Sequence, residues 1–390
     1  MDSNDNSSQT PIASLNRRSA LRHLAVGGAA AVGFHGAVLA QGHTLRIGAI
    51  FANSGPEKVN GAGMFQGSSA YFDAVNRAGG INGAKVELVM ADDQFNPDIA
   101  KQHAQTFAAD AGMLAIVHPL GTRQTAALMD TVKDMAIVGP NTGTVALRKK
   151  PSPNTFWVRA NYEQEVEKLI STATTLGITK VGLVHPKDPL GAGLLAAFNA
   201  ACERHKIKPA IIATTPSTIS PEVEPAAKAI AEAAPQVVIM GLGAGTAPLF
   251  VRALRGAGST STIYGLSIAM SAANIRELGE LSRGLGFSII VPSPFATKYD
   301  IVRRYQTDME AAGSKDFSLP SLEGYIDARV LAEGLRRAGA NPTRASIVAG
   351  LDQIESLDLG GVRIGYGKGA REGNHFVDVA VIGSSGRFMT

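Results

Sequence analysis

The sequence predicts an α/β protein of two lobes, each built on a doubly wound parallel sheet. Its 390 residues exceed what one compact core usually holds, so two domains are expected. From Thr44 onward, short β-branched runs alternate with amphipathic stretches, which is the pattern of repeated βα units. The proline-containing run at residues 149–154 interrupts both periodicities and divides this series into halves.

The first half contains four predicted strands and three predicted helices. The strands are expected at residues 44–51, 85–91, 113–119 and 136–139, and the helices at 62–78, 97–110 and 123–134. Gly79 and Gly80 end the first helix, because a left-handed residue there satisfies the freed carbonyl groups. Asn82 and Gly83 then form the tight turn into the second strand.

The second half repeats the pattern after an extended run at residues 155–158. Helices are expected at 162–176, 191–205, 222–233 and 246–257, and strands at 180–185, 209–214, 236–241 and 262–267. A proline-rich break at 291–294 precedes three helical stretches at 297–312, 321–339 and 343–352, and strands return at 361–367 and 375–383.

This late change of pattern predicts that the chain returns to the first lobe and then crosses again to the second. We expect lobe 1 to contain residues 43–160 plus 293–357 and lobe 2 to contain 161–292 plus 358–390. The hinge strands are expected near residues 157–162, 289–295 and 355–361. Ligands of open parallel sheets sit beyond the carboxyl ends of the strands, so we expect a site in the loops there.

The composition argues against nucleic-acid binding and against cysteine or metal chemistry. The net charge is +4, but the basic residues are scattered singly or in short pairs. The single cysteine, Cys202, excludes an intramolecular disulfide and a cysteine zinc site, and its apolar neighbours predict burial. No metal-binding histidine spacing or nucleophile-elbow motif is present, so we expect no cofactor, metal or catalytic residue. His118 and His185, each before a proline, are expected at structural or cleft-edge positions.

The first forty residues have the layout of an export signal. Arg17 and Arg18 precede an apolar run, rich in alanine and glycine, from Leu24 to Ala40. The small residues that end this run predict cleavage after Ala40 and a mature chain in the periplasm. The paired arginines resemble the twin-arginine export motif, with Sec export as the alternative. A permanent membrane anchor is disfavoured because the run is weakly hydrophobic and contains His35.

Several motifs resemble the type I periplasmic binding proteins of the branched-chain amino acid family. They are Ser54-Gly55-Pro56, Asn76-Arg77-Ala78-Gly79-Gly80-Ile81-Asn82-Gly83, Asp92-Asp93-Gln94, Ser321-Leu322-Glu323-Gly324-Tyr325, the Gly360-Gly361 hairpin and Gly386-Arg387-Phe388. The resemblance covers residues 43–390 and implies two lobes, joined by a three-strand hinge, that close on a small molecule. It further implies that the protein serves an ABC importer, whose inner-membrane permease receives the ligand. Members of the family are usually monomers, so a monomer is expected. Asp92 and Asp93 are expected to form a cap or turn in preference to contacting ligand.

In the family, a hydroxyl after the third strand and the loop after the fourth bind the ligand's carboxylate. These positions correspond here to Gly121-Thr122 and to Asn141-Thr142-Gly143-Thr144. Hydroxyl groups and nearby backbone N–H groups suit an anion. Simple capping of a helix is the alternative role of Thr122.

The resemblance also implies that the ligand is not an ordinary α-amino acid. Ser267 stands where amino-acid binders carry the glutamate that pairs with the ammonium, and a buried unpaired ammonium is costly. The family's aromatic walls are replaced by Asn60, Leu190 and Gly243, and its disulfide positions by Phe95 and Leu120. We therefore expect an aromatic or aliphatic acid, with a branched-chain amino acid less favoured. Tyr325 either contributes a ring or hydroxyl to the cleft or belongs to the core.

Two other functions are alternatives to import. A periplasmic ligand-sensing subunit would have the same fold and a different partner. An NAD-dependent dehydrogenase would use the glycine-rich turn at residues 241–246, but the glycine spacing differs from that of a dinucleotide fold. We expect that turn to line the cleft.

Overall fold

The computed structural model describes residues 44–269, 271–366, 371–384, 386, 388 and 389. The expected export signal, with its arginine pair and its cleavage after Ala40, lies outside the described residues, as does Arg387. In the described part of the chain, no helix has both the length and the apolar character needed to cross a membrane.

The first sheet has five strands in the order β2-β1-β3-β4-β5. They are β1 (Thr44–Phe51), β2 (Lys85–Asp92), β3 (Met113–Val117), β4 (Ala136–Val138) and β5 (Thr155–Phe156), all paired in parallel. The connecting helices are α1 (Lys58–Arg77), α2 (Pro97–Ala109), α3 (Thr122–Thr131) and the short α4 (Val145–Arg148). β3 is buried along its whole length, as a strand covered by helices on both faces requires.

The second sheet has seven strands in the order β14-β13-β10-β9-β8-β6-β7. They are β6 (Val181–Pro186), β7 (Ile211–Thr215), β8 (Val237–Met240), β9 (Thr262–Gly265), β10 (Gly286–Ile289), β13 (Asp378–Ile382) and β14 (Phe388–Met389). The strands from β6 to β10 are parallel, whereas β13 and β14 run antiparallel to their neighbours. The helices of this lobe are α5 (Tyr162–Thr175), α6 (Pro189–Arg204), α7 (Glu224–Ala233), α8 (Ala247–Gly256), α9 (Ala272–Leu278) and the 3-10 turn η1 (Gly279–Ser282).

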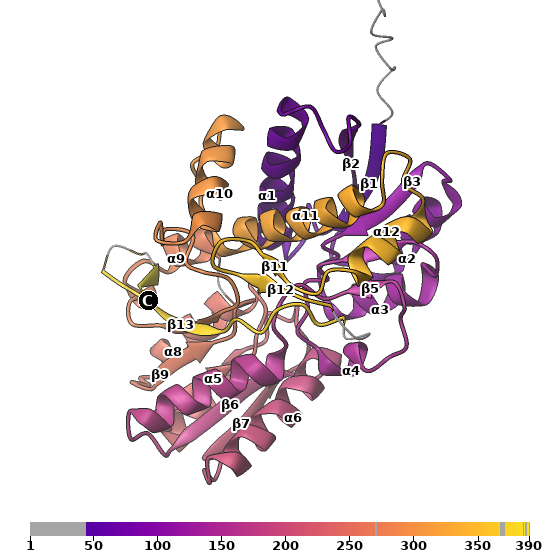
Figure 1. Ribbon diagram of the computed structural model, residues 1–390. Coiled ribbons are helices and arrows are strands. Elements are labelled where there is room, and N and C mark those ends of the chain that lie inside the picture. The colour runs from indigo at the N-terminus through magenta and orange to yellow at the C-terminus, as the bar shows by residue number, and fades with distance from the viewer. Residues whose placement is uncertain (1–43, 270, 367–370, 385, 387, 390) are drawn as a thin grey trace, which may run out of the picture. The chain divides into compact units, whose positions relative to one another are not determined.

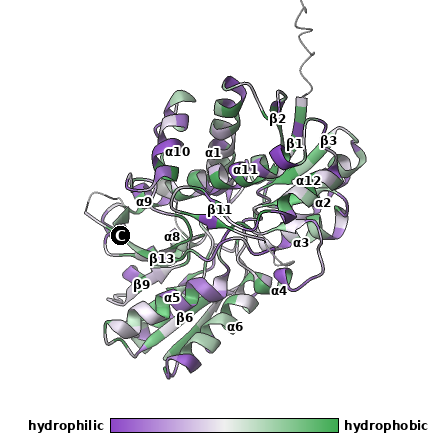
Figure 2. Cartoon of the chain, viewed as in Figure 1, coloured by the Kyte–Doolittle hydropathy of each residue, from purple (hydrophilic) through white to green (hydrophobic). Residues whose placement is uncertain are grey.

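Three later helices pack with the elements of the first sheet. α10 (Asp300–Ala311) and α11 (Leu319–Arg337) contact α1, and α12 (Arg344–Asp352) contacts β3 and β4 (Figure 1). Glycines allow the close approach of α1 and α11: a Cβ on Gly67 would lie 1.7 Å from the Ser321 carbonyl oxygen, and one on Gly324 would lie 2.1 Å from that of Met64. Figure 2 shows the hydrophobic residues concentrated on strands such as β3 and β6, with hydrophilic segments on outer helices such as α10.

Three segments that connect the two sheets lie side by side. The Trp157 amide donates to the Arg371 carbonyl oxygen at 2.8 Å, and the Gly373 amide donates to the Trp157 carbonyl oxygen at 2.8 Å. The Asn374 side-chain amide donates to the Ile290 carbonyl oxygen at 3.3 Å. The first two segments match the expected hinge positions, but the third differs.

The third hinge segment was expected at residues 355–361, and the structure places residues 371–374 beside Trp157 instead. Residues 357–364 form a small hairpin of β11 (Leu357–Asp358) and β12 (Arg363–Ile364). Gly360 and Gly361 have positive φ and make its turn, while Val362 and Ile364 are buried in the same apolar cluster as α11. The expected strand at 361–367 is therefore only two residues long. The lobe boundaries given by the sequence stay a prediction.

Candidate ligand-binding cavity

A cavity of about 150 Å³ lies among the loops that follow the strands of both sheets. Its wall is contributed by the β1–α1 loop, the β2–α2 loop, the start of α3, the loop after β4, the start of α5 and four segments of the second lobe. The lining residues are Glu57, Asn60, Phe95, Pro97, Leu120, Gly121, Thr122, Arg123, Gln124, Asn141, Tyr162, Asp188, Pro189, Leu190, Ser217, Thr218, Ile219, Gly243 and Ile268. Six of the ten residues predicted from the sequence are among them: Asn60, Gly121, Thr122, Asn141, Leu190 and Gly243.

Three predicted threonines form a hydroxyl cluster at the wall of the cavity. Thr122 Oγ1 lies 2.8 Å from Thr142 Oγ1 and 3.1 Å from Thr144 Oγ1, and the last two are 3.1 Å apart. Thr122 lines the cavity, whereas Thr142 and Thr144 are buried behind it and orient its hydroxyl. The capping alternative for Thr122 does not hold, because Gly121 is the N-cap residue and no side chain caps α3.

The N-terminus of α3 borders the cavity beside this cluster. Gly121 adopts φ 102, a conformation that favours glycine, and the Thr125 amide donates to its carbonyl oxygen at 3.0 Å. The N–H groups of Thr122, Arg123 and Gln124 precede the first intrahelical bond and have no partner in the helix ladder. Together with the threonine hydroxyls they provide donors and a positive dipole end, which suit a carboxylate.

Apolar side chains complete much of the wall. Phe95 and Leu120, at the two positions where the resemblance places a disulfide, both border the cavity and belong to one apolar cluster. A Cβ at Gly121 would lie 2.8 Å from the Phe95 ring, so glycine is needed there for packing as well as for its φ angle. From the second lobe, Leu190 and Ile268 add aliphatic surface. The cavity therefore combines a polar pole with an apolar body.

Glu57, which sequence reasoning missed, also faces the cavity. It is the N-cap residue of α1 and is only 4% exposed. Its Oε2 accepts from Asn60 Nδ2 at 3.0 Å, and its Oε1 accepts from the Gly245 amide at 3.2 Å, across to the second lobe. Burial raises the pKa of Glu57 to about 7, and these hydrogen bonds only partly offset that effect. No periodicity or motif marks this position, because its burial depends on the β8–α8 turn of the other lobe.

Besides Thr142 and Thr144, which lie behind the wall, two more predicted site residues do not line the cavity. Ser267 lies at a small adjoining cavity with Asn60 and Asn141, and its hydroxyl accepts from Arg159 Nη2 at 2.5 Å. Tyr325 belongs to the core: it is 2% exposed, and its hydroxyl donates to Asp308 at 2.7 Å. The prediction that Tyr325 contributes to the cleft is corrected, because α11 is buried nearly all round and directs this ring between Tyr71 and Tyr305.

A buried ion network lies beneath the site, where the chain passes between the sheets. Arg159 pairs with Glu165 Oε1 at 3.0 Å and with Glu323 Oε1 at 3.4 Å. Burial alone would lower the pKa of Arg159, but the attraction of the nearby Glu323 and Glu165 carboxylates is stronger, so the pKa of Arg159 is raised. Burial also raises the pKa of Glu323 and of Asp327, whose carboxyl oxygens find no hydrogen-bond donor among the described residues. The network joins α5 of the second lobe to α11 through the first hinge segment.

The expected turn role of Asp92 and the expected structural position of His118 are confirmed. Asp92 accepts from the amides of Asn53, Ser54 and Gln94, as expected of a turn residue. His118 is buried and lies 3.0 Å from Ser68 Oγ, and burial lowers its pKa to about 4. Neither His118 nor His185 lines the cavity. Among the residues that the structure describes, no cluster of side chains has the composition of a metal site.

Comparison with known proteins identifies the family to which this chain is similar. A family model described as periplasmic binding protein matches residues 44–387. A Leu/Ile/Val-binding protein homolog of Brucella melitensis is 28% identical over 179 residues, which are 45% of this chain and 48% of the relative. The chain thus spans about half the length of the first curated relatives that it matches. A Leu/Ile/Val-binding protein of Rhizobium johnstonii is 23% identical over 83% of this chain and 88% of its own length.

Solved structures agree with this assignment. A substrate-binding periplasmic protein from Ralstonia solanacearum is 27% identical, with a TM-score of 0.82, over 88% of this chain and 99% of that one. The resemblance drawn from the sequence motifs is confirmed. The chain belongs to the periplasmic binding protein family of solute-binding proteins, as a type I member similar to the Leu/Ile/Val-binding proteins.

Proposed function

We propose that this protein is the periplasmic substrate-binding component of an ABC importer and that it binds a small solute bearing a carboxylate. The observation that carries the proposal is the threonine cluster beside the N-terminus of α3, at the wall of a largely apolar cavity. Hydroxyl and N–H donors suit a single carboxylate, and Arg123, the cation among the lining residues, is exposed. The ligand-binding residues in this proposal are Asn60, Gly121, Thr122, Asn141, Leu190 and Gly243, with Thr142, Thr144 and Ser267 behind them.

The size and lining of the cavity support a small ligand with an apolar body. Its volume of about 150 Å³ equals that of an engineered protein cavity that holds benzene. Two neighbours of the same fold have titles that name benzoate and isoleucine as their bound molecules, and both of these compounds carry a carboxylate. At 16% and 17% identity those neighbours share the fold alone, so they supply probes and not an assignment.

The mechanism that we propose is hinge closure. The ligand docks on the lobe that carries Thr122, and the second lobe then closes over it through its Leu190 and Gly243 loops. The segments around Trp157, Ile290 and Gly373 serve as the hinge, and the hydrogen bond between Glu57 and the Gly245 amide is a contact of the closed form. The closed form is presented by an exported monomer to an inner-membrane permease.

A sensing role is the alternative that one comparison favours. A chemotactic substrate-binding protein of Halobacterium salinarum is 35% identical over 111 residues, which are 27% of each chain. A sensor would bind the same ligand and differ only in its partner. Co-purification with a permease supports import, whereas co-purification with a receptor supports sensing.

A thermal-shift screen tests the ligand class. Benzoate, phenylacetate and 3-methylbutanoate are compared with L-isoleucine and with NAD, in wild type and in Thr144→Ala. A ligand at a hundredfold excess over its Kd stabilises the folded state by about 2.7 kcal/mol, which raises the Tm measurably. We expect an acid to raise the Tm of wild type and to have a smaller effect on the variant. A Tm raised by NAD, or by none of the acids, would refute the proposal.

A further inference from the structure

Glu57 is the cavity residue whose role the carboxylate site leaves open. Its carboxyl group is buried, borders the cavity, and accepts hydrogen bonds from uncharged donors, the Asn60 side chain and the amides of Ala244 and Gly245. A Cβ at Gly243 would lie 2.7 Å from Glu57 Oε1, so the backbone of the second lobe packs directly on the Glu57 carboxyl group, with no side chain between them. Such a close fit fixes the carboxyl group in place at the wall of the cavity.

The surrounding elements supply no countercharge. Residues 241–251, which contain the turn packed on Glu57 and the first half of α8, have no charged side chain. Within the described residues, no cation lies within ion-pairing distance of Glu57, and Lys58 on its own helix is exposed. The other titratable groups of the cavity wall are Arg123, which is exposed, Tyr162 and Asp188. Asp188 is already occupied, since it accepts from the amides of Gly191 and Thr218.

A bound anion would act on Glu57 through the same low-dielectric cavity. Burial raises the pKa of Glu57 to about 7, so its neutral and ionised forms are both populated near pH 7. A ligand carboxylate held by Thr122 adds a second negative charge, and like charges in one site favour protonation of one of them. A ligand ammonium would have the opposite effect, because it would keep Glu57 ionised.

We propose that Glu57 is a specificity-determining residue of the carboxylate site: as a neutral carboxylic acid it donates a hydrogen bond to an oxygen of the anionic ligand. The inference rests on the proposed function. The ionised Glu57 takes one proton from the solvent as the anion binds, so the occupied cavity carries one negative charge in place of two. The protein therefore selects anions over zwitterions through this one carboxyl group.

The test measures proton uptake and affinity by isothermal titration calorimetry between pH 6 and pH 9. The probes are benzoate, phenylacetate and 3-methylbutanoate as anions and L-isoleucine as a zwitterion. Titrations in phosphate and in Tris, whose protonation enthalpies differ, count the protons taken up. For wild type, we expect the association constant of an anion to fall about tenfold per pH unit above pH 7, with uptake approaching one proton.

Two variants isolate the role of Glu57. Glu57→Gln keeps the shape and a hydrogen-bond donor, so its affinity for the acid should not change with pH and should exceed that of wild type at pH 9. Glu203→Gln, an exposed position on α6 away from the cavity lining, should behave as wild type. Proton uptake by wild type needs no variant and tests the inference even where Glu57→Gln folds poorly.

The outcomes separate this inference from the proposed function. An acid that binds wild type with equal affinity at pH 6 and pH 9, without proton uptake, would overturn the role of Glu57 and leave the carboxylate site standing. Isoleucine binding that is lost in Glu57→Gln would also overturn it, because Glu57 would then be the ionised partner of an ammonium. Failure of every probe at pH 6 would overturn the proposed function and this inference together.

Discussion

Replacing Arg159 by methionine should destabilise the protein strongly, because it leaves buried carboxylates without their cation. Arg159 is 2% exposed, and both of its acidic partners, Glu165 and Glu323, are buried as well. Removing one member of a buried ion pair costs about 3–5 kcal/mol, mostly from the uncompensated charge that stays behind. The raised pKa of Glu323 allows it to take up a proton, which limits the loss. We therefore expect Arg159→Met to lower the free energy of unfolding by about 4 kcal/mol at pH 7.

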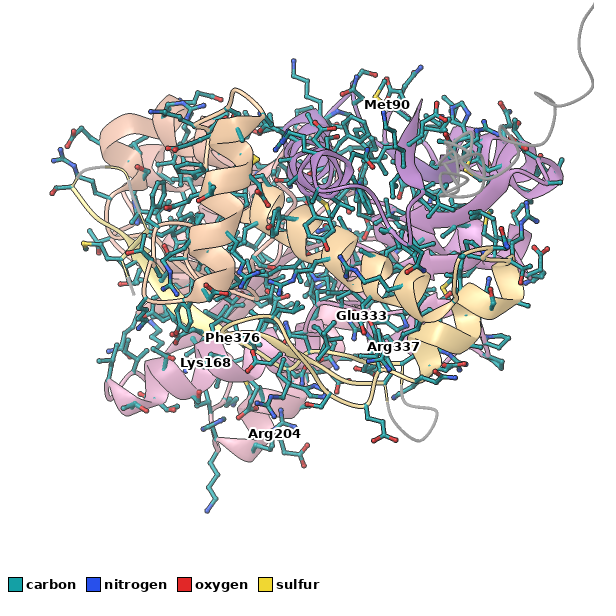
Figure 3. The ribbon with its side chains drawn as sticks, turned by 45° about the horizontal axis from the view of Figure 1, so that its top comes forward. Met90, Lys168, Arg204, Glu333, Arg337 and Phe376 are labelled. Atoms are coloured by element: carbon teal, nitrogen blue, oxygen red, sulfur yellow. The ribbon has the colours of Figure 1, made fainter. Side chains whose placement is uncertain are left out.

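Urea unfolding followed by circular dichroism measures this change, with Arg204→Met as the matched control. Figure 3 labels Arg204 on α6, where its side chain is 54% exposed and pairs with Glu167. An exposed ion pair contributes at most about 1 kcal/mol, so the control should unfold almost as wild type does. If Arg159→Met loses no more stability than Arg204→Met, the network does not join the lobes in the way that its geometry indicates.

Two further predictions concern the core. Gly324→Ala should lower the free energy of unfolding by about 3 kcal/mol or more, because its Cβ would overlap the Met64 carbonyl oxygen and force α1 and α11 apart. The control is Gly256→Ala, in open space at the end of α8, which should leave the free energy of unfolding unchanged in the same urea titration. His118 has a folded pKa of about 4 against an ordinary value of 6.5, so the unfolded chain binds its proton first and stability is lost as pH falls from 6.5 to 4. The difference in unfolding free energy between wild type and His118→Gln should shrink by about 3 kcal/mol over that range, and a constant difference would show that His118 does not titrate as its burial requires.

The βα periodicity was sufficient to place most elements of the two lobes. Each predicted strand of the first series ends within two residues of the observed one, because buried parallel strands are short apolar runs between amphipathic helices. Two short elements were missed, because a segment of four residues is too short to show a helix or strand periodicity. β10 has four residues and merges in the sequence with the hinge segment that follows it. α4 is a single turn.

The cavity was predictable where it depends on strand ends and not where it depends on the other lobe. Thr122 and Asn141 follow strands of one sheet, so their convergence follows from the topology. Glu57 becomes a cavity residue only because the turn after β8 covers it, which no local pattern encodes. Tyr325 was ambiguous for a related reason: a helix that is apolar on all sides does not reveal which neighbour each ring meets.

The affinity of Thr122→Val for the acid that most raises the Tm of wild type is the most direct test of the carboxylate site. A hydrogen bond to a charged group contributes about 1.5–3 kcal/mol, so losing the Thr122 hydroxyl should weaken binding by roughly 10- to 150-fold. Thr131→Val, also on α3 but with its hydroxyl bonded to the Ala127 carbonyl oxygen outside the cavity, should bind as wild type does. Calorimetric dissociation constants that are equal for all three proteins would contradict the account, since the threonine cluster would then not hold the ligand.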